Sequence, residues 1–291
     1  MKLLKSIFAI MLIATVTTSC DKNEEVYEPH ENYLEQDYTG CFNYIYKKSV
    51  EAGTISIGTT YKFRWRADNT ADIYVYNAKF SAMMPDGINI TFEGLEWKEV
   101  DGVKKITLTD VIPTAVTMNG ETVDASTYVI DALNLSVIER RMEDTYIPVI
   151  NMSMTMGGVE VVTIQQRRMY FGSTMVTNNM ASTNYTSESS YYLVTLNPLT
   201  KQATIDIYQA KFAEMMPAMD MKFSEIPFEL SNMGYTLACE ELIPTIKEGN
   251  NDVPYDEYKI TNLSGVGQYD TGMDLNFDCR GVFTVQANLK Y

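Results

Sequence analysis

The chain contains one sequence pattern twice. The segment ADIYVYNAKFSAMMP at residues 71–85 recurs as ATIDIYQAKFAEMMP at residues 203–217, an offset of 132, and nine of the fifteen positions are identical. Residues 38–40 (YTG) and 170–172 (YFG) match at the same offset. A repeat of this length restricts the fold to one that the same order of strands and turns can build twice. We therefore expect two related units.

The repeated units read as antiparallel β-structure. Apolar side chains alternate along the chain at Ile73 and Val75, and again at Ile205 and Ile207. Short links centred on glycine, such as Asp101-Gly102, separate neighbouring apolar segments and are typical of hairpin turns. Each unit has room for roughly eight strands, a number at which a closed barrel is either filled by side chains or holds one small ligand. The predicted fold is all-β, with two tandem eight-stranded antiparallel barrels.

The boundaries follow from the repeat and from the start of the chain. We expect a signal peptide at residues 1–19, an acidic tether at 20–37, a first barrel at 38–168 and a second at 169–291. The segment between the two units is not rich in Pro, Gly or Ser, so freely swivelling domains are disfavoured. We expect the two units to pack against each other or to share a sheet.

The first twenty residues resemble the leader of a bacterial lipoprotein. Lys2 and Lys5 precede an apolar stretch, and small polar residues precede Cys20, which resembles a lipobox. This resemblance implies acylation of Cys20 and a membrane anchor of several acyl chains. The acidic residues that follow resemble the surface-export signal of Bacteroidetes lipoproteins, which implies the outer membrane and the cell surface. The alternatives are a plain signal peptide with an incidental cysteine and an ordinary solvated tether.

The units also resemble a known family. The early Tyr-x-Gly, the strand that carries Ala-Lys-Phe into Met-Met-Pro, and the glycine-centred hairpin near the end of each unit are similar to the calycin-like lipoproteins of Bacteroidetes. The resemblance covers both units. It implies a lipocalin-like β-barrel without an established activity.

Charge and residue inventory limit the possible functions. The chain has 23 basic and 38 acidic residues, with a formal charge of −15, so a nucleic-acid partner is not expected. Its single histidine, His30, lies in the acidic tether, and its cysteines show no closely spaced pair of metal ligands. We predict no cofactor, no metal and no enzymatic activity. A pair of distant carboxylates that meet in space would leave a hydrolase open.

Two Met-Met-Pro segments are the candidate ligand contacts. Met83 and Met84, like Met215 and Met216, directly follow a predicted strand and precede a proline. Flexible thioethers at the mouth of a barrel adapt to an apolar ligand or partner. The alternative is that these side chains close the barrel end and belong to the core.

The remaining candidates are thiols and aromatic rings. Cys239 and Cys279 are either a disulfide, which export permits, or small hydrophobic core residues. Candidates for stacking on sugars are Trp65, Trp97, Tyr191 and Tyr192, with packing as the alternative.

The leading hypothesis is a non-enzymatic lipoprotein that binds a small hydrophobic or glycan ligand, or a neighbouring surface protein. A structural or adhesive spacer with filled barrels is the first alternative, and a glycan hydrolase is the second.

Overall fold

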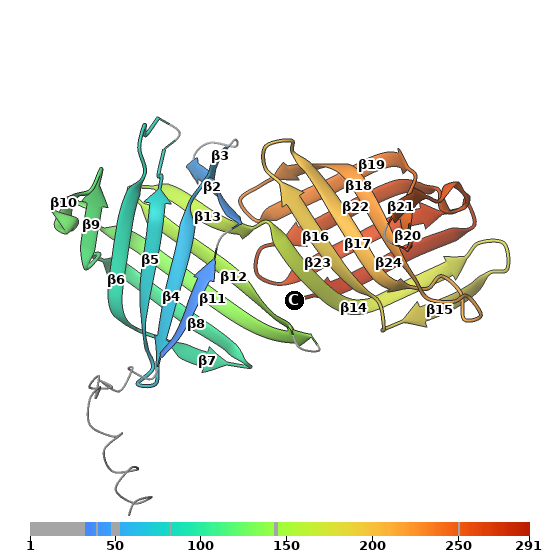
Figure 1. Ribbon diagram of the computed structural model, residues 1–291, viewed down its shortest axis with the longest axis horizontal. Helices are drawn as coiled ribbons and strands as arrows, with labels where there is room; N and C mark the ends of the chain where they lie inside the picture. The colour runs from blue at the N-terminus through green and yellow to red at the C-terminus, as the bar shows by residue number, and fades with distance from the viewer. Residues whose placement is uncertain (1–32, 39, 48–52, 82, 143–144, 250) are drawn as a thin grey trace, which may run out of the picture.

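The computed structural model describes residues 33–291 except for 39, 48–52, 82, 143–144 and 250 (Figure 1). Cys20, the predicted signal peptide and most of the tether lie outside the described residues. Strand β1 begins at Tyr33 and pairs with β4, so the last residues of the predicted tether belong to a sheet. The described chain consists of 24 strands and two short 3-10 helices at Ala125–Thr127 and Asp256–Tyr258.

The second half of the chain contains one closed eight-stranded antiparallel barrel. The strand order is β17-β16-β14-β24-β23-β22-β19-β18, and pairing of β17 with β18 closes the ring. The barrel strands are β14 (Arg167–Asn178), β16 (Tyr191–Asn197), β17 (Gln202–Ala210), β18 (Met219–Leu230), β19 (Gly234–Leu242), β22 (Ile260–Gln268), β23 (Gly272–Cys279) and β24 (Phe283–Lys290). Three further strands extend the sheet, namely β15 (Thr183–Ser187), β20 (Thr245–Glu248) and β21 (Asn251–Pro254). Large rings, among them Tyr170, Tyr192, Phe223 and Phe277, pack its interior.

The first half forms two open antiparallel sheets and not the closed barrel that we predicted from the sequence. Sheet A has the order β1-β4-β5-β6-β9-β10, and sheet B has the order β3-β2-β13-β12-β11-β8-β7. Sheet A contains β1 (Tyr33–Tyr38), β4 (Thr60–Arg66), β5 (Thr70–Ala78), β6 (Ile88–Glu96), β9 (Ala115–Met118) and β10 (Glu121–Val123). Sheet B contains β2 (Cys41–Lys47), β3 (Thr54–Ile57), β7 (Lys98–Val100), β8 (Val103–Val111), β11 (Ile130–Met142), β12 (Thr145–Met156) and β13 (Val159–Gln165).

The physical reason for the difference lies at two corners. The chain passes from sheet A to sheet B between β1 and β2, next to Gly40, and again between β6 and β7, at Trp97. In the second half the matching strands β14 and β18 run through without a break. Interrupting two strands opens the hydrogen-bonded ring into two layers, and a shared apolar core fills the space between them.

The repeated segment folds in the same way in both halves. The pairing of β5 with β6 shifts register between Val75 and Ala78, and the pairing of β17 with β18 shifts between Ile207 and Ala210. A residue with positive φ lies inside each bulge, Asn77 at 57° and Gln209 at 56°. Such bulges bend a strand and re-aim its side chains. Strand β13 ends at Gln165 and β14 begins at Arg167, beside the boundary predicted between the units.

Candidate functional site

The outer face of sheet B changes from polar to apolar across its strands. Thr107, Asn134, Ser153, Val162 and Tyr44 form one cross-strand row from β8 to β2. Their inward neighbours on β11, Leu133 and Leu135, are buried in the core between the sheets. Because side chains alternate along each strand, the polar members of the row all point away from that core. The β8-β11-β12 part of the outer face is therefore polar, and the β13-β2 part is apolar.

The barrel covers the apolar part of this face. Phe42, Tyr44 and Tyr46 of β2 are buried in the same hydrophobic cluster as the barrel interior. Their neighbours on the strand, such as Ile45, point the other way into the core of the first half. Strand β2 is thus buried on both faces, which holds the two halves together through the hydrophobic effect.

One buried arginine ties the halves at this junction. Arg168 at the start of β14 is 1% exposed, and its Nη1 donates to the carbonyl of Tyr269 (3.1 Å) and to the hydroxyl of Tyr291 (2.6 Å). Its Nη2 donates to the carbonyl of Ile150 in sheet B (3.4 Å). The guanidinium also lies 5.4 Å from the centre of the Tyr291 ring. No carboxylate of the described residues forms an ion pair with it.

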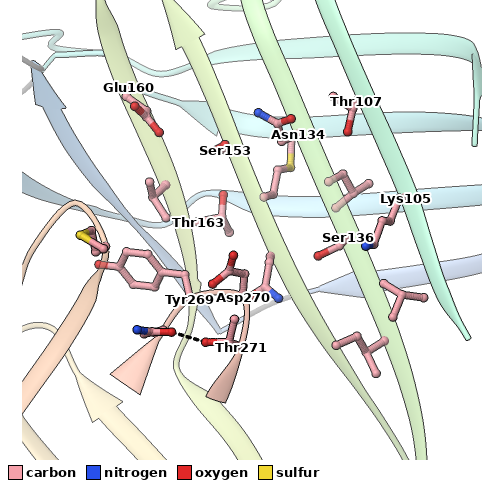
Figure 2. Close-up of a pocket in the computed structure, with 18 of the residues that line it drawn as sticks. Lys105, Thr107, Asn134, Ser136, Ser153, Glu160, Thr163, Tyr269, Asp270 and Thr271 are labelled. Carbon is pink, nitrogen blue, oxygen red and sulfur yellow. Dashed lines mark hydrogen bonds between the residues drawn. The ribbon is translucent and has the colours of Figure 1, made fainter. Parts of the chain in front are cut away.

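A cleft of about 850 Å³ lies between the polar part of sheet B and one end of the barrel (Figure 2). Its barrel wall comes from the turn after β18, at Asn232 and Met233, and from the turn after β22, at residues 268–271. The second turn is fixed because the hydroxyl of Tyr269 donates to the carbonyls of Ser231 (2.8 Å) and Gly234 (2.9 Å). Other polar wall residues, all on sheet B, are Lys105, Thr107, Asn134, Ser136, Asn151, Ser153, Glu160 and Thr163.

The two walls carry three charged side chains. Lys105 and Glu160 lie on sheet B, and Asp270 lies on the barrel turn. The hydroxyl of Tyr46, opposite Glu160 on the next strand, hydrogen-bonds to that carboxylate. Burial, and then this neighbouring carboxylate, raise the pKa of Tyr46 above its ordinary value. Of the charged residues that line the cleft, one is a cation and two are carboxylates, so the lining does not favour an anionic ligand.

The amide of Asn151 has no hydrogen-bond partner among the residues that the structure describes. Its Nδ2 and Oδ1 atoms each expose less than 1 Å² and form no hydrogen bond, although the residue lines the cleft. Ser136 stands opposite Asn151 on the neighbouring strand. A buried amide that lacks partners costs about 1–3 kcal/mol.

The methionines predicted as ligand contacts lie outside this cleft. Met83 and Met215 are 91% and 94% exposed in the loops after β5 and β17. The sulfur atoms of Met84 and Met216 instead accept the backbone N–H of Phe80 (3.2 Å) and Phe212 (3.3 Å). Met84 and Met216 pack against the cores of their halves. This arrangement fits the alternative of a core-closing role for the second methionine of each pair.

The three cysteines of the described chain are free thiols. Cys239 on β19 and Cys279 on β23 are separated by the whole of β22. Two strand spacings amount to roughly 10 Å, and a disulfide needs Cα atoms within about 7 Å. The bridge that the sequence left open is not formed. Cys279 is fully buried and behaves as a core residue.

Two of the aromatic candidates are buried and two, Trp97 and Tyr191, are half-buried. Trp65 and Tyr192 are buried, so they pack and do not stack on a ligand. Trp97 stands edge-on to Trp65 at a ring distance of 5.7 Å, and Tyr191 stacks on Tyr208 at 4.5 Å.

The sequence did not predict the cleft, because residues of both halves of the chain form it. Its sequence signal is the alternation of Asn134 and Ser136 with buried leucines, which marks an outer polar face.

No protein-family model matches the chain, and no curated protein or solved structure matches it significantly. Among the residues that the structure describes, no three His, Cys, Asp or Glu side chains are grouped to hold a metal ion. No helix in the described part of the chain is long and apolar enough to cross a membrane.

Proposed function

We propose that this protein binds a small carbohydrate in the cleft between its two halves, without catalysing a reaction. The observation that carries the proposal is the cleft itself. Its volume of about 850 Å³ falls within the range of about 300–1,000 Å³ that is usual for small-ligand sites. The barrel interior, in contrast, is filled by aromatic side chains.

The chemistry of the walls favours a glycan over a hydrophobic ligand. Asn134, Ser136 and Ser153 offer amide and hydroxyl groups that both donate and accept hydrogen bonds. Sugar hydroxyls have the same dual character. Val103, Ile138 and Met233 add smaller apolar patches for the C–H faces of a sugar ring.

Titration with neutral oligosaccharides of glucose, galactose, mannose and xylose tests the proposal. The soluble chain without its leader is titrated by calorimetry, next to Asn134→Trp, which places a bulky ring in the cleft. Ser264→Trp is the matched control, because Ser264 is exposed on β22, the barrel strand that corresponds to β11. We expect one sugar class to bind the wild type and S264W but not N134W. Equal binding by all three proteins, or by none, contradicts the proposal.

A glycan hydrolase is the second candidate, since one carboxylate from each half lines the cleft. Glu160 lies on β13 and Asp270 on the barrel turn. Most glycosidases use two carboxylate residues on opposite sides of the sugar for catalysis. If the wild type releases reducing ends and both Glu160→Gln and Asp270→Asn lose this activity, the protein is a hydrolase. If the wild type binds the sugar without cleaving it, the protein is the non-catalytic binding protein proposed above.

The proposal places the protein on the outer membrane, held by acyl chains at Cys20 and facing the cell exterior. The lipobox-like leader and the acidic residues after Cys20 support this placement. Metabolic labelling with a radioactive fatty acid is expected to label the wild type and not Cys20→Ser. Protease treatment of intact cells is expected to digest the wild type.

The proposal also assigns both halves to the calycin-like architecture. The strand order of the first half, read across its two corners, follows that of the closed barrel. If the cleft binds no ligand, the alternative function is that of a rigid spacer at the cell surface.

A further inference from the structure

The backbone at Asn151 is fixed while its side chain is left without partners. The N–H of Ile150 donates to the Oε1 atom of Gln165 (3.3 Å), and the carbonyl of Ile150 accepts from Arg168 (3.4 Å). Asn151 follows directly and lines the cleft with a buried amide that forms no hydrogen bond. The site is therefore held in place from both sides of the junction, while both polar atoms of the Asn151 amide have no partner among the described residues.

Asn151 lies in the middle of the hydroxyl-rich wall. Ser136 is its partner across the ladder, and Lys105 is in turn the partner of Ser136 on β8. Residues at such positions have Cβ atoms about 4.5–5.5 Å apart, so one ligand can contact several of them. On β23, which takes the place of β12 in the barrel, the polar residue Asp274 is exposed and accepts from Asn288 (2.6 Å). The unpaired amide is a property of the cleft and not of the repeated scaffold.

We propose that Asn151 determines the specificity of the cleft by pairing with two adjacent hydroxyls of a neutral sugar. This inference rests on the proposed function. An amide presents a donor and an acceptor side by side, and one hydroxyl accepts from its Nδ2 while the next donates to its Oδ1. A carboxylate of the ligand would only accept, so the buried Oδ1 would stay unpaired. An apolar ligand would satisfy neither atom.

The ligand reaches the amide by a rotation within the Asn151 side chain. The terminal torsion of Asn is broad and two-fold, so the amide turns without a costly change of rotamer. Glu160 and Asp270 outnumber Lys105 in the lining, so the charges of the cleft disfavour an anionic ligand. The specificity of the cleft then depends on whether the sugar has an intact vicinal diol.

The test compares Asn151→Leu with Asn276→Leu in the soluble chain. Leucine has the same branched shape as asparagine, although it is larger, and it removes both unpaired atoms, so the thermal midpoint of N151L is expected to equal or exceed that of the wild type. The side chain of Asn276, exposed on β23, has no hydrogen bond among the described residues, and N276L controls for the substitution itself. A structural role for the amide predicts instead that N151L lowers the midpoint.

Binding is measured with the best sugar of the panel and with its monodeoxy analogues. The wild type and N276L are expected to bind the intact sugar at least about ten-fold more tightly than one deoxy analogue, whereas N151L binds both about equally and more weakly. If the wild type binds a sugar and N151L keeps the ten-fold discrimination, or if N151L is less stable than N276L, the role of Asn151 is wrong while the carbohydrate site stands. If the wild type binds no sugar of the panel, the proposed function and this inference both fail.

Discussion

The two halves have the same polar arrangement inside and different surfaces outside. Tyr61 in the first half hydrogen-bonds to Asn43 (2.7 Å), and Tyr192 in the second half hydrogen-bonds to Thr174 (2.7 Å). The next residue after Asn43 on β2, Tyr44, is 6% exposed. The next residue after Thr174 on the matching strand β14, Met175, is 40% exposed. The same strand position is thus covered by a partner in one half and open to solvent in the other.

This difference explains how a duplicated fold acquires a site. Two copies with unchanged outer faces would have no reason to dock on each other. A row of aromatic residues on β2 gives one copy an apolar face, and the end of the barrel covers it. The polar strands beside that face then become one wall of the cleft, which belongs to neither half alone.

Removing an aromatic side chain from the junction gives the largest expected effect. Phe42 is fully buried, and Phe42→Ala is expected to lower the free energy of unfolding by about 3–5 kcal/mol, since it leaves a cavity between the halves. Met175→Ala on the matching open face is expected to change it by less than about 0.5 kcal/mol. Urea titrations of the two variants measure both values. Equal losses would show that the two outer faces do not differ.

Thiol reactivity gives the next effect, a difference of about a hundred-fold or more. Burial raises the pKa of the Cys41 thiol to about 11 and that of Cys279 to about 12. At pH 8 roughly one thiol in a thousand or fewer is ionised at these positions. Mass mapping after brief alkylation at pH 8 is expected to find Cys239 modified and the two buried cysteines intact.

The same thiols fix the sign of a pH effect. The unfolded thiols ionise near pH 9, while the folded ones stay protonated, so the free energy of unfolding falls as the pH rises above about 9. Rapid alkylation of Cys279 in the folded protein would contradict both statements.

The internal tyrosines sharpen the comparison. Tyr61→Phe removes a phenol that accepts from Thr163 (2.7 Å) and donates to Asn43, and it leaves two buried groups unpaired. We expect a loss of about 2–4 kcal/mol, against about 1–2 kcal/mol for Tyr192→Phe, which frees only Thr174. Denaturant titration compares the two. A larger loss of unfolding free energy in Y192F than in Y61F would contradict this prediction.

The methionine loops give the smallest effects, equal in both copies. Met84→Ala and Met216→Ala are each expected to cost about 1 kcal/mol, because both side chains pack on a core and accept an N–H. Met83→Ala and Met215→Ala are expected to stay within about 0.5 kcal/mol, since both side chains are exposed. Thermal unfolding of all four variants measures this. Clearly unequal losses at the two copies would show that the loops have diverged in structure.

Much of the fold was predictable from the sequence, because it depends on local signals. Alternation at Ile73 and Val75 predicts an antiparallel strand, and the offset of 132 predicts that this strand occurs twice, as it does in β5 and β17. The closed barrel of the second half confirms that part of the prediction. The opening of the first half depends on two corners, at Gly40 and Trp97, that no turn signal in the sequence distinguishes from β14 and β18.

The site was not predictable, because it depends on which surfaces meet. The run CFNYIY at residues 41–46 is almost continuously apolar, which indicates burial on both faces of the strand. The sequence does not indicate which part of the molecule covers its outer face. Asn151 looks like any polar residue of a half-exposed strand. Only the docking of the barrel turn at residues 268–271 makes it part of a cleft.

Hydrogen–deuterium exchange with and without the bound sugar tests the location of the site most directly. A ligand in the cleft contacts both halves, so we expect slower exchange together at residues 134–136, 151–153 and 268–271, and unchanged exchange in β16 and β17. Protection confined to the barrel strands, or to one half of the chain, would contradict a site built by the junction.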